Sequence, residues 1–162
     1  MIGFEPAVLA LARALSARGW KLATAESCTG GLIAAACTSV AGSSDWFERG
    51  FVTYSNAAKT GLLGVPAVLI EAHGAVSAEV ARAMAEGALA RSQAQLTVAV
   101  TGVAGPGGGT PAKPVGTVWL AFARVGRATE TELLTLDGDR ASVREQTVHH
   151  ALRRLLDAAG RT

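Results

Sequence analysis

Ser27 and Lys59 are the two side chains whose types and positions best suit catalysis. Ser27 lies in the sequence ESCTGG (residues 26–31), where an expected strand turns into an expected helix, a place that suits a nucleophile. Lys59 is one of three lysines and lies among apolar residues, so burial would lower its pKa and give a neutral amine that can act as a general base. The alternatives are that Ser27 or Thr29 only caps a helix, and that Lys59 extends over an apolar helix to water.

The turn after Ser27 also suits an anion. The backbone amides of Cys28, Thr29 and Gly30 lie just before an expected helix, whose positive dipole end favours negative charge. The turn therefore predicts a site for an oxyanion or a phosphate. Cys28 is a rival nucleophile because a helix N-terminus lowers the pKa of a thiol. Its expected partner would be a histidine, and the histidines lie in other segments, at His73, His149 and His150.

Tyr54 and Arg140 are further candidates with polar side chains. Tyr54, the only tyrosine, ends an expected strand over 50–55, and its hydroxyl could hold Lys59 or relay a proton. A half-buried strand tyrosine with one hydrogen bond is the alternative. Arg140, at the start of the last expected helix, could bind a phosphate through two donors or be a solvated surface charge.

A long glycine-containing loop follows the expected strand over 95–100. Thr101 and Gly102 open it, where a hydroxyl and backbone amides could meet a ligand, although an ordinary turn is the alternative. Gly105 and the glycines after it match neither the P-loop spacing nor the dinucleotide-binding spacing. The loop therefore allows a ligand to approach the backbone closely without being a named motif.

Composition and charge exclude several classes of protein. The chain has 162 residues, 49% hydrophobic, and a formal net charge of +2 with no basic cluster, which suits a single domain spanning residues 1–162 and argues against a nucleic-acid partner. No apolar run reaches the ~18 residues of a membrane helix and no signal peptide is visible, so we expect a cytoplasmic protein with a small-molecule ligand. The cysteines and histidines lack metal-site spacing, so we expect neither a metal nor a cofactor. Assembly into a homo-oligomer is left open.

The elements that must position these residues alternate along the chain. Strands that alternate with helices, followed by a hairpin, predict an α/β fold with a mixed, mostly parallel sheet between helix layers. Ligands bind at the carboxyl ends of parallel strands, so the segments 26–31, 54–59 and 101–109 should converge. Strands are expected at 20–25, 50–55, 95–100, 115–123 and 129–136, and helices at 6–18, 32–36, 56–63, 66–72, 77–92 and 140–159.

Several longer blocks resemble one family. They are TAESCTGG (24–31), AGSSDWFERGFVTYSN (41–56), HGAVS (73–77), TGVAGPGG (101–108) and KPVGTV (113–118). In this order they closely resemble the CinA C-terminal domain family, the nicotinamide-nucleotide amidohydrolases, from about Thr24 to Arg140. Several long blocks in the right order are far more specific than one short motif.

The resemblance implies a three-layer α/β/α sandwich and a reaction. The reaction is hydrolysis of the carboxamide of nicotinamide mononucleotide to nicotinic acid mononucleotide and ammonia, without a metal. Matched motif by motif, the resemblance implies a serine–lysine pair formed by Ser27 and Lys59. Two alternatives remain, a nucleotide-binding module without turnover and an amidase for another nucleotide-like amide. The other positions that the resemblance associates with the site are Tyr54, Ser44, Thr101 and Arg140. Ala112 stands where relatives often have an acidic residue, so details of the loop are not carried over.

Overall fold

The computed structural model describes residues 3–160, which contain a five-stranded mixed sheet. The strand order is β2-β1-β3-β4-β5. The pairs β1–β2 and β1–β3 are parallel, whereas β4 is antiparallel to both of its neighbours, so β5 again runs with the first three strands. The expected mixed sheet is confirmed. The strands are β1 (Leu22–Glu26), β2 (Phe47–Val52), β3 (Leu96–Gly102), β4 (Thr117–Arg124) and β5 (Glu130–Thr135).

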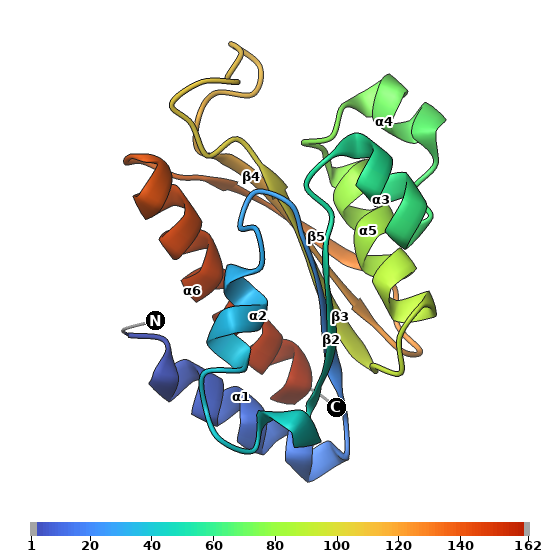
Figure 1. The fold of residues 1–162 in the computed structure, drawn as a ribbon, viewed down its shortest axis with the longest axis vertical. Helices are drawn as coiled ribbons and strands as arrows, with labels where there is room; N and C mark the ends of the chain where they lie inside the picture. Colours follow the sequence, from blue (N-terminus) through green and yellow to red (C-terminus); the bar gives the residue numbers. More distant parts are fainter. Residues whose placement is uncertain (1–2, 161–162) are drawn as a thin grey trace.

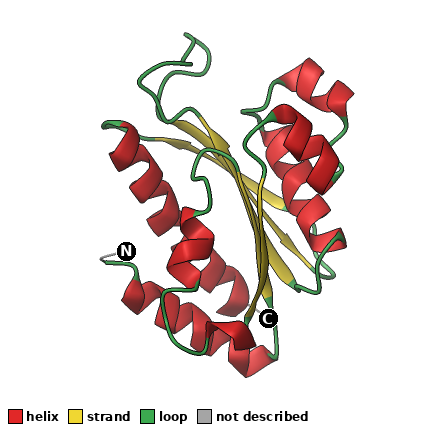
Figure 2. Cartoon of the chain, in the orientation of Figure 1, coloured by secondary structure: helices red, strands yellow, loops and turns green. Residues whose placement is uncertain are grey.

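Helices cover both faces of the sheet, which makes the molecule a three-layer α/β/α sandwich (Figures 1 and 2). Each helix layer encloses its own hydrophobic core against the sheet. One layer consists of α1 (Glu5–Arg18), α2 (Leu32–Cys37) and α6 (Arg140–Gly160). The other consists of α3 (Asn56–Leu63), α4 (Ala67–His73) and α5 (Ala78–Ala90).

The strand β1 is buried along its whole length, and its side chains alternate between the two cores. Leu22 packs in the core beneath α1 and α6, whereas Ala25 packs in the core beneath α5. One residue further on, the carboxylate of Glu26 reaches α2. The next residue, Ser27, faces Lys59 of α3. Adjacent residues at the carboxyl end of β1 therefore serve opposite faces of the sheet.

The second strand lies earlier than expected. It covers Phe47–Val52 and not 50–55, so Tyr54 lies beyond the strand. The reason is that β2 is an edge strand whose first half contains Glu48, Arg49 and Gly50, so no apolar run marks its start. The remaining expected elements start and end within two residues of those observed.

Helix ends follow the signals in the sequence. Ser55 and Ser77 cap α3 and α5, and their hydroxyl oxygens accept the amides of Ala58 and Val80. Gly19 ends α1 in the left-handed region, with φ 65°. These expectations are confirmed, as is the antiparallel pairing of β4 and β5. No helix within residues 3–160 is both long and apolar enough to cross a bilayer.

Candidate active site

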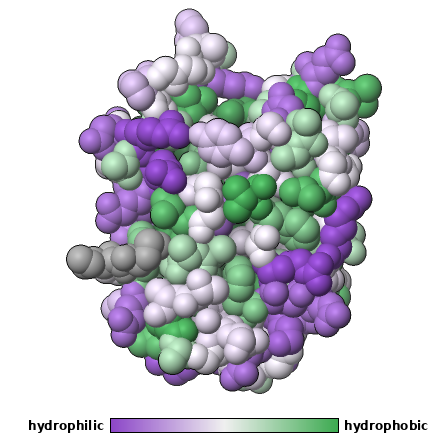
Figure 3. All heavy atoms as spheres, viewed as in Figure 1, coloured by the Kyte–Doolittle hydropathy of each residue, from purple (hydrophilic) through white to green (hydrophobic). Residues whose placement is uncertain are grey.

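A cavity of about 310 Å³ opens at the carboxyl ends of β1 and β3. In the space-filling view, the top of the molecule is notched between the loop that precedes β4 and the side that carries α4 (Figure 3). All three segments that were expected to converge contribute to the cavity. Its lining residues are Ser27, Cys28, Tyr54, Asn56, Lys59, Ala75, Val76, Thr101, Gly102, Val103, Ala104, Gly105, Gly107, Gly108 and Arg140.

Lys59 is buried at the floor of this cavity, with 1% of its surface exposed. Its Nζ lies 3.1 Å from Ser27 Oγ, 3.2 Å from the carbonyl oxygen of Thr53 and 3.4 Å from that of Tyr54. Within residues 3–160, no carboxylate forms an ion pair with it. Burial therefore lowers the pKa of the amine below its usual 10.5. The alternative in which the amine reaches water is wrong.

The turn that carries Ser27, the Ser27 turn (residues 27–31), is held by an internal anion. The buried carboxylate of Glu26 accepts the hydroxyl of Thr29 at 2.6 Å and the amides of Ile33 and Ala34 at 2.8 and 3.0 Å. The amides of Ile33 and Ala34 are donors in the first turn of α2, and without Glu26 they would have no partner within the helix. The dipole end of α2 is thus occupied by the protein itself.

The amides of the Ser27 turn differ in what they can bind. The amide of Gly30 donates to the carbonyl of Ser27 at 3.0 Å, so the expectation that it binds an anion is wrong. The tight turn uses that amide internally. The amides of Cys28 and Thr29 donate to no backbone acceptor in the part of the chain that the structure describes, but only Cys28 lines the cavity, whereas Thr29 is completely buried.

The Cys28 thiol is buried rather than activated. Burial raises its pKa to about 11, the opposite of the expected effect of a helix N-terminus. The expectation fails because α2 begins only at Leu32, and its first amides bind Glu26. A thiol with this pKa contributes almost no thiolate at neutral pH, so Cys28 is a poor nucleophile.

Tyr54 and Arg140 form the rim of the cavity. The Tyr54 side chain is 60% exposed, and its hydroxyl accepts a hydrogen bond from Nη2 of Arg140 at 2.9 Å. Nη1 of Arg140 donates to the carbonyl of Gly105 at 2.8 Å. The hydroxyl of Tyr54 therefore does not hold Lys59, as the sequence suggested that it could; the carbonyl of Tyr54 contacts the amine instead.

Thr101 and Gly102 end β3 at the wall of the cavity. The hydroxyl of Thr101 donates to the carbonyl of Ala75 at 2.8 Å and so ties the segment before α5 to the sheet. A Cβ at Gly102 would lie 2.8 Å from Val118 Cγ2, so only glycine fits there. The loop that follows (residues 103–116), called here the glycine-rich loop, carries Gly105 along the cavity.

Ser44 lies elsewhere. It belongs to a short 3-10 turn (Ser43–Asp45) just before β2, at the end of the sheet where β1 and β2 begin. The six residues of β2 separate this turn from the cavity, and Ser44 does not line it. A substrate contact from Ser44, expected from the resemblance, is not formed within this chain.

Asn56 and Arg144 are site residues that the sequence reasoning missed. Asn56 lines the cavity from the first turn of α3, and it directly follows the cap Ser55, which was the available signal. Arg144 donates to the carbonyls of Cys28 and Thr29. The signal for it was its spacing of four from Arg140, which places both on one helix face.

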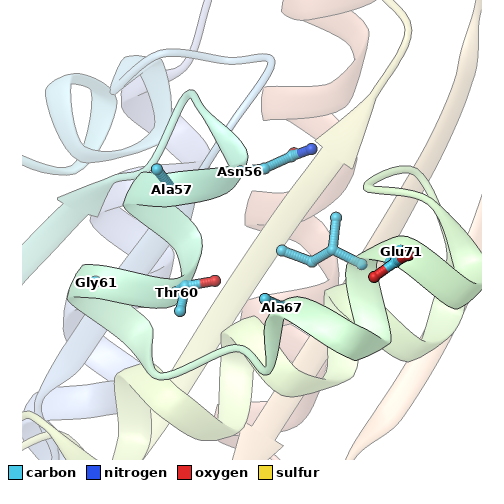
Figure 4. Close-up of a pocket in the computed structure, with 7 residues that line it drawn as sticks. Asn56, Ala57, Thr60, Gly61, Ala67 and Glu71 are labelled. Atoms are coloured by element: carbon cyan, nitrogen blue, oxygen red, sulfur yellow. The ribbon is translucent and has the colours of Figure 1, made fainter.

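A second hollow of about 530 Å³ opens between α3 and α4 (Figure 4). It shares Asn56 with the first cavity, and Glu71 is its one ionisable lining residue among those described. We therefore assign the chemistry to the first cavity. Residues 3–160 contain no group of three His, Cys, Asp or Glu side chains that could hold a metal ion.

Comparison with known proteins gives a consistent result. The family model described as "CinA C-terminal domain" matches residues 5–159. A protein of Pseudomonas putida named "Nicotinamide-nucleotide amidohydrolase PncC" is 61% identical over 136 residues, which cover 84% of each chain. A crystal structure from Agrobacterium tumefaciens, titled as competence/damage inducible protein CihA, superposes with a TM-score of 0.93 at 45% identity. The superposition covers 98% of this chain and 96% of that one.

Other relatives are much longer than this chain. A "Putative competence-damage inducible protein" of Symbiobacterium thermophilum is 59% identical over 151 residues, which are 88% of this chain but 35% of that protein. The chain therefore spans about a third of the length of such relatives. It spans most of the Pseudomonas protein.

Proposed function

The chain belongs to the CinA C-terminal domain family, and from that premise we propose that it hydrolyses the carboxamide of nicotinamide mononucleotide to nicotinic acid mononucleotide and ammonia. The Pseudomonas relative is matched over 84% of its own length, so little of that enzyme lacks a counterpart here. The observation that carries the proposal is the buried Lys59 amine, unpaired with any described carboxylate and 3.1 Å from the Ser27 hydroxyl inside a cavity.

The contacts of Lys59 orient it as a base. A neutral amine has two N–H donors and one lone pair, and carbonyl oxygens can only accept. The carbonyls of Thr53 and Tyr54 take the two N–H groups at 3.2 and 3.4 Å. The lone pair is then free to face Ser27 Oγ, which lies 3.1 Å from Nζ, and to accept the hydroxyl proton during the reaction. Two backbone acceptors thus fix the direction in which the proton moves.

The reaction follows as two acyl transfers. Ser27 Oγ attacks the carboxamide carbon while its proton passes to Lys59 Nζ. The tetrahedral intermediate collapses, the C–N bond breaks, and the amine nitrogen takes the proton from Lys59 and leaves as ammonia. Water then attacks the ester, with Lys59 again as base, and releases the carboxylic acid and free Ser27. The pyridinium charge of the substrate assists by withdrawing electrons from the attacked carbon.

The two ends of the substrate require separate anion sites. The amide of Cys28 is the candidate for the developing oxyanion, because Cys28 adjoins the nucleophile and lines the cavity, and its amide donates to no backbone acceptor among the described residues. The phosphate is assigned to Arg140 and to the backbone at Gly105, Gly107 and Gly108 on the opposite rim. The N-terminus of α2 is unsuitable for the phosphate because Glu26 already occupies it.

Replacing the nucleophile tests the proposal most directly. Ser27→Ala should abolish ammonia release from nicotinamide mononucleotide at neutral pH, while the nucleotide still binds, as measured by calorimetry. Wild-type protein that binds the nucleotide without releasing ammonia would be a binding module. Activity on other nucleotide-like amides, but not on nicotinamide mononucleotide, would mean that the proposed substrate is wrong. A Ser27→Ala variant with wild-type turnover would remove the assignment of the nucleophile.

A further inference from the structure

Arg144 reaches the Ser27 turn from α6 without entering the cavity. Its Nε donates to the carbonyl of Cys28 at 3.2 Å, and its Nη2 donates to the carbonyl of Thr29 at 3.3 Å. Binding two successive carbonyls in this way uses the planar edge of a guanidinium, which an ammonium cannot reproduce. Arg144 is therefore placed to act on the backbone beside the nucleophile rather than on the substrate.

One peptide unit connects the guanidinium to Ser27. In a trans peptide the C=O and N–H groups point in opposite directions. The carbonyl of the Thr29–Gly30 peptide accepts from Arg144, and its amide donates to the carbonyl of Ser27 at 3.0 Å. Hydrogen bonds in such a chain polarise one another, and a charged donor strengthens the chain. Arg144 thus helps to fix the main chain at the residue that carries the nucleophile.

The Ser27–Cys28 peptide carries the candidate oxyanion donor. Its carbonyl accepts the amide of Gly30 at 3.0 Å, so the amide of Cys28 points away from that contact. The amide of Cys28 donates to no backbone acceptor among the described residues, and Cys28 lines the cavity. A donor on the carbonyl withdraws electrons from the peptide and makes its N–H a stronger donor. Arg144 therefore acts, through the Thr29–Gly30 peptide, on the amide that the mechanism requires.

Glu26 holds the turn from the other side. Its carboxylate accepts a hydrogen bond from the hydroxyl of Thr29 at 2.6 Å. Thr29 is therefore held through its side chain by the carboxylate of Glu26 and through its carbonyl by the guanidinium of Arg144. Glu26 and Arg144 form no ion pair with each other in the described structure; each binds the turn instead. The turn is clamped between the sheet and α6.

We propose that Arg144 is a positioning residue for catalysis, which holds the Ser27 turn so that Ser27 Oγ faces Lys59 and the amide of Cys28 faces the developing oxyanion. The proposal rests on the proposed function. A misplacement of reacting groups by about 1 Å can cost about a hundredfold in rate, so loss of this bracing should lower kcat while the rim that binds substrate is unchanged.

Arg144→Ala should lower kcat for nicotinamide mononucleotide about ten- to hundredfold and change KM less than about threefold. Arg144→Lys should recover little of this, because lysine lacks the two-donor edge. Guanidinium chloride, added well below denaturing concentrations, should restore part of kcat to Arg144→Ala and none to Arg144→Lys. The matched control is Arg153→Ala, which removes an arginine from the same helix. Among the described residues Arg153 forms a hydrogen bond only with His150, so this variant should keep wild-type kinetics.

A second readout does not depend on the substrate. Phenylmethylsulfonyl fluoride reacts with an activated serine: the Ser27 Oγ–S bond forms, fluoride leaves and the hydroxyl proton passes to Lys59. Intact-mass spectrometry should show slower labelling of Ser27 in Arg144→Ala than in wild type or Arg153→Ala. Labelling without turnover of the nucleotide would refute the proposed substrate and leave the role of Arg144 supported by the labelling rates.

Three outcomes overturn the proposal. They are a folded Arg144→Ala variant with wild-type kcat or labelling rate, a variant whose loss lies entirely in KM, and wild-type protein that is neither labelled nor active. If Arg144→Ala fails to fold in a thermal melt, the same comparison is made with Arg144→Lys, whose charge is kept; wild-type kcat in that variant also overturns the proposal.

Discussion

The floor and the rim of the cavity are built in different ways. On the floor, Ser27 and Lys59 are buried, and their positions are set by β1, by capped helix α3 and by backbone hydrogen bonds. On the rim, Tyr54 is 60% exposed, and Arg140 connects its hydroxyl to the carbonyl of Gly105 in the glycine-rich loop. The comparison teaches that the groups proposed for bond breaking are buried and preorganised, whereas those proposed for binding lie at the exposed rim, on a helix end and a loop.

Removing the base should give the largest effect that separates floor from rim. Lys59→Met should lower kcat about 10²- to 10⁴-fold with little change in nucleotide affinity, because the rim is intact. Steady-state ammonia release and calorimetry measure the two quantities. A change in affinity alone would make Lys59 a binding residue and would remove the contrast between the two regions.

The same variant should be more stable than the wild type. A buried amine with a lowered pKa binds fewer protons in the folded than in the unfolded chain, so stability falls as the pH drops from 10.5 towards the lowered pKa. Methionine fills a similar volume without this cost, so Lys59→Met should melt at a higher temperature near neutral pH. An unchanged melting temperature would contradict the cost assigned to the amine.

The pH dependence of activity should report the pKa of Lys59 on the floor of the cavity rather than any group on the rim. Because the pKa of Lys59 is lowered below 10.5, kcat/KM should rise about tenfold per pH unit at low pH and reach a plateau above that pKa. Cys28→Ala should not raise the midpoint, since the thiol, whose pKa lies at about 11, can only raise the pKa of Lys59. A midpoint that rises in Cys28→Ala would implicate the thiol.

Arg140 tests the rim. Arg140→Ala should raise KM about tenfold or more, as expected for loss of a charge-assisted hydrogen bond, and change kcat much less. Binding of inorganic phosphate, measured as a competitive inhibitor, should weaken by a similar factor. Loss of kcat at constant KM would instead place Arg140 with the floor.

Lys113 should give the smallest effect. Its Nζ donates to the carbonyl of His73 at 2.8 Å and fastens the glycine-rich loop to the end of α4, in an exposed place. An exposed hydrogen bond contributes about 1 kcal/mol, so Lys113→Ala should raise KM only about two- to fivefold. Hydrogen exchange should quicken in residues 103–116 and stay unchanged in the Ser27 turn.

Much of the fold could be predicted from the sequence because local signals agreed with tertiary structure. Capping serines and glycines marked where helices begin and end. In α6 the apolar stripe of the sequence matches the buried residues Val148, Leu152, Leu155 and Ala159. The start of β2 could not be predicted, because the first half of this edge strand contains charged residues and a glycine and no apolar run. That residues 1–162 form one independent domain stays a prediction.

The site could be predicted in part. The convergence of the segments that carry Ser27 and Lys59 followed from topology, since both follow parallel strands, and the family resemblance implied that the two form a pair. The roles of Glu26 and Arg144 could not be foreseen, because they depend on which backbone groups of the turn are already bonded. For Cys28, closeness in sequence to a helix start led to a wrong prediction of a lowered thiol pKa. The helix begins four residues later, and desolvation of the thiol has the larger effect on its pKa.

The alternation at the end of β1 has an evolutionary consequence. Glu26 binds α2 on one face of the sheet, and Ser27, the next residue in the chain, contacts Lys59 on the other face. Inserting or deleting one residue within β1 would exchange their sides, sending a carboxylate towards Lys59 and a hydroxyl towards α2. A change of one residue in the length of β1 therefore cannot keep both functions, whereas a change of two residues leaves each side chain on its own face.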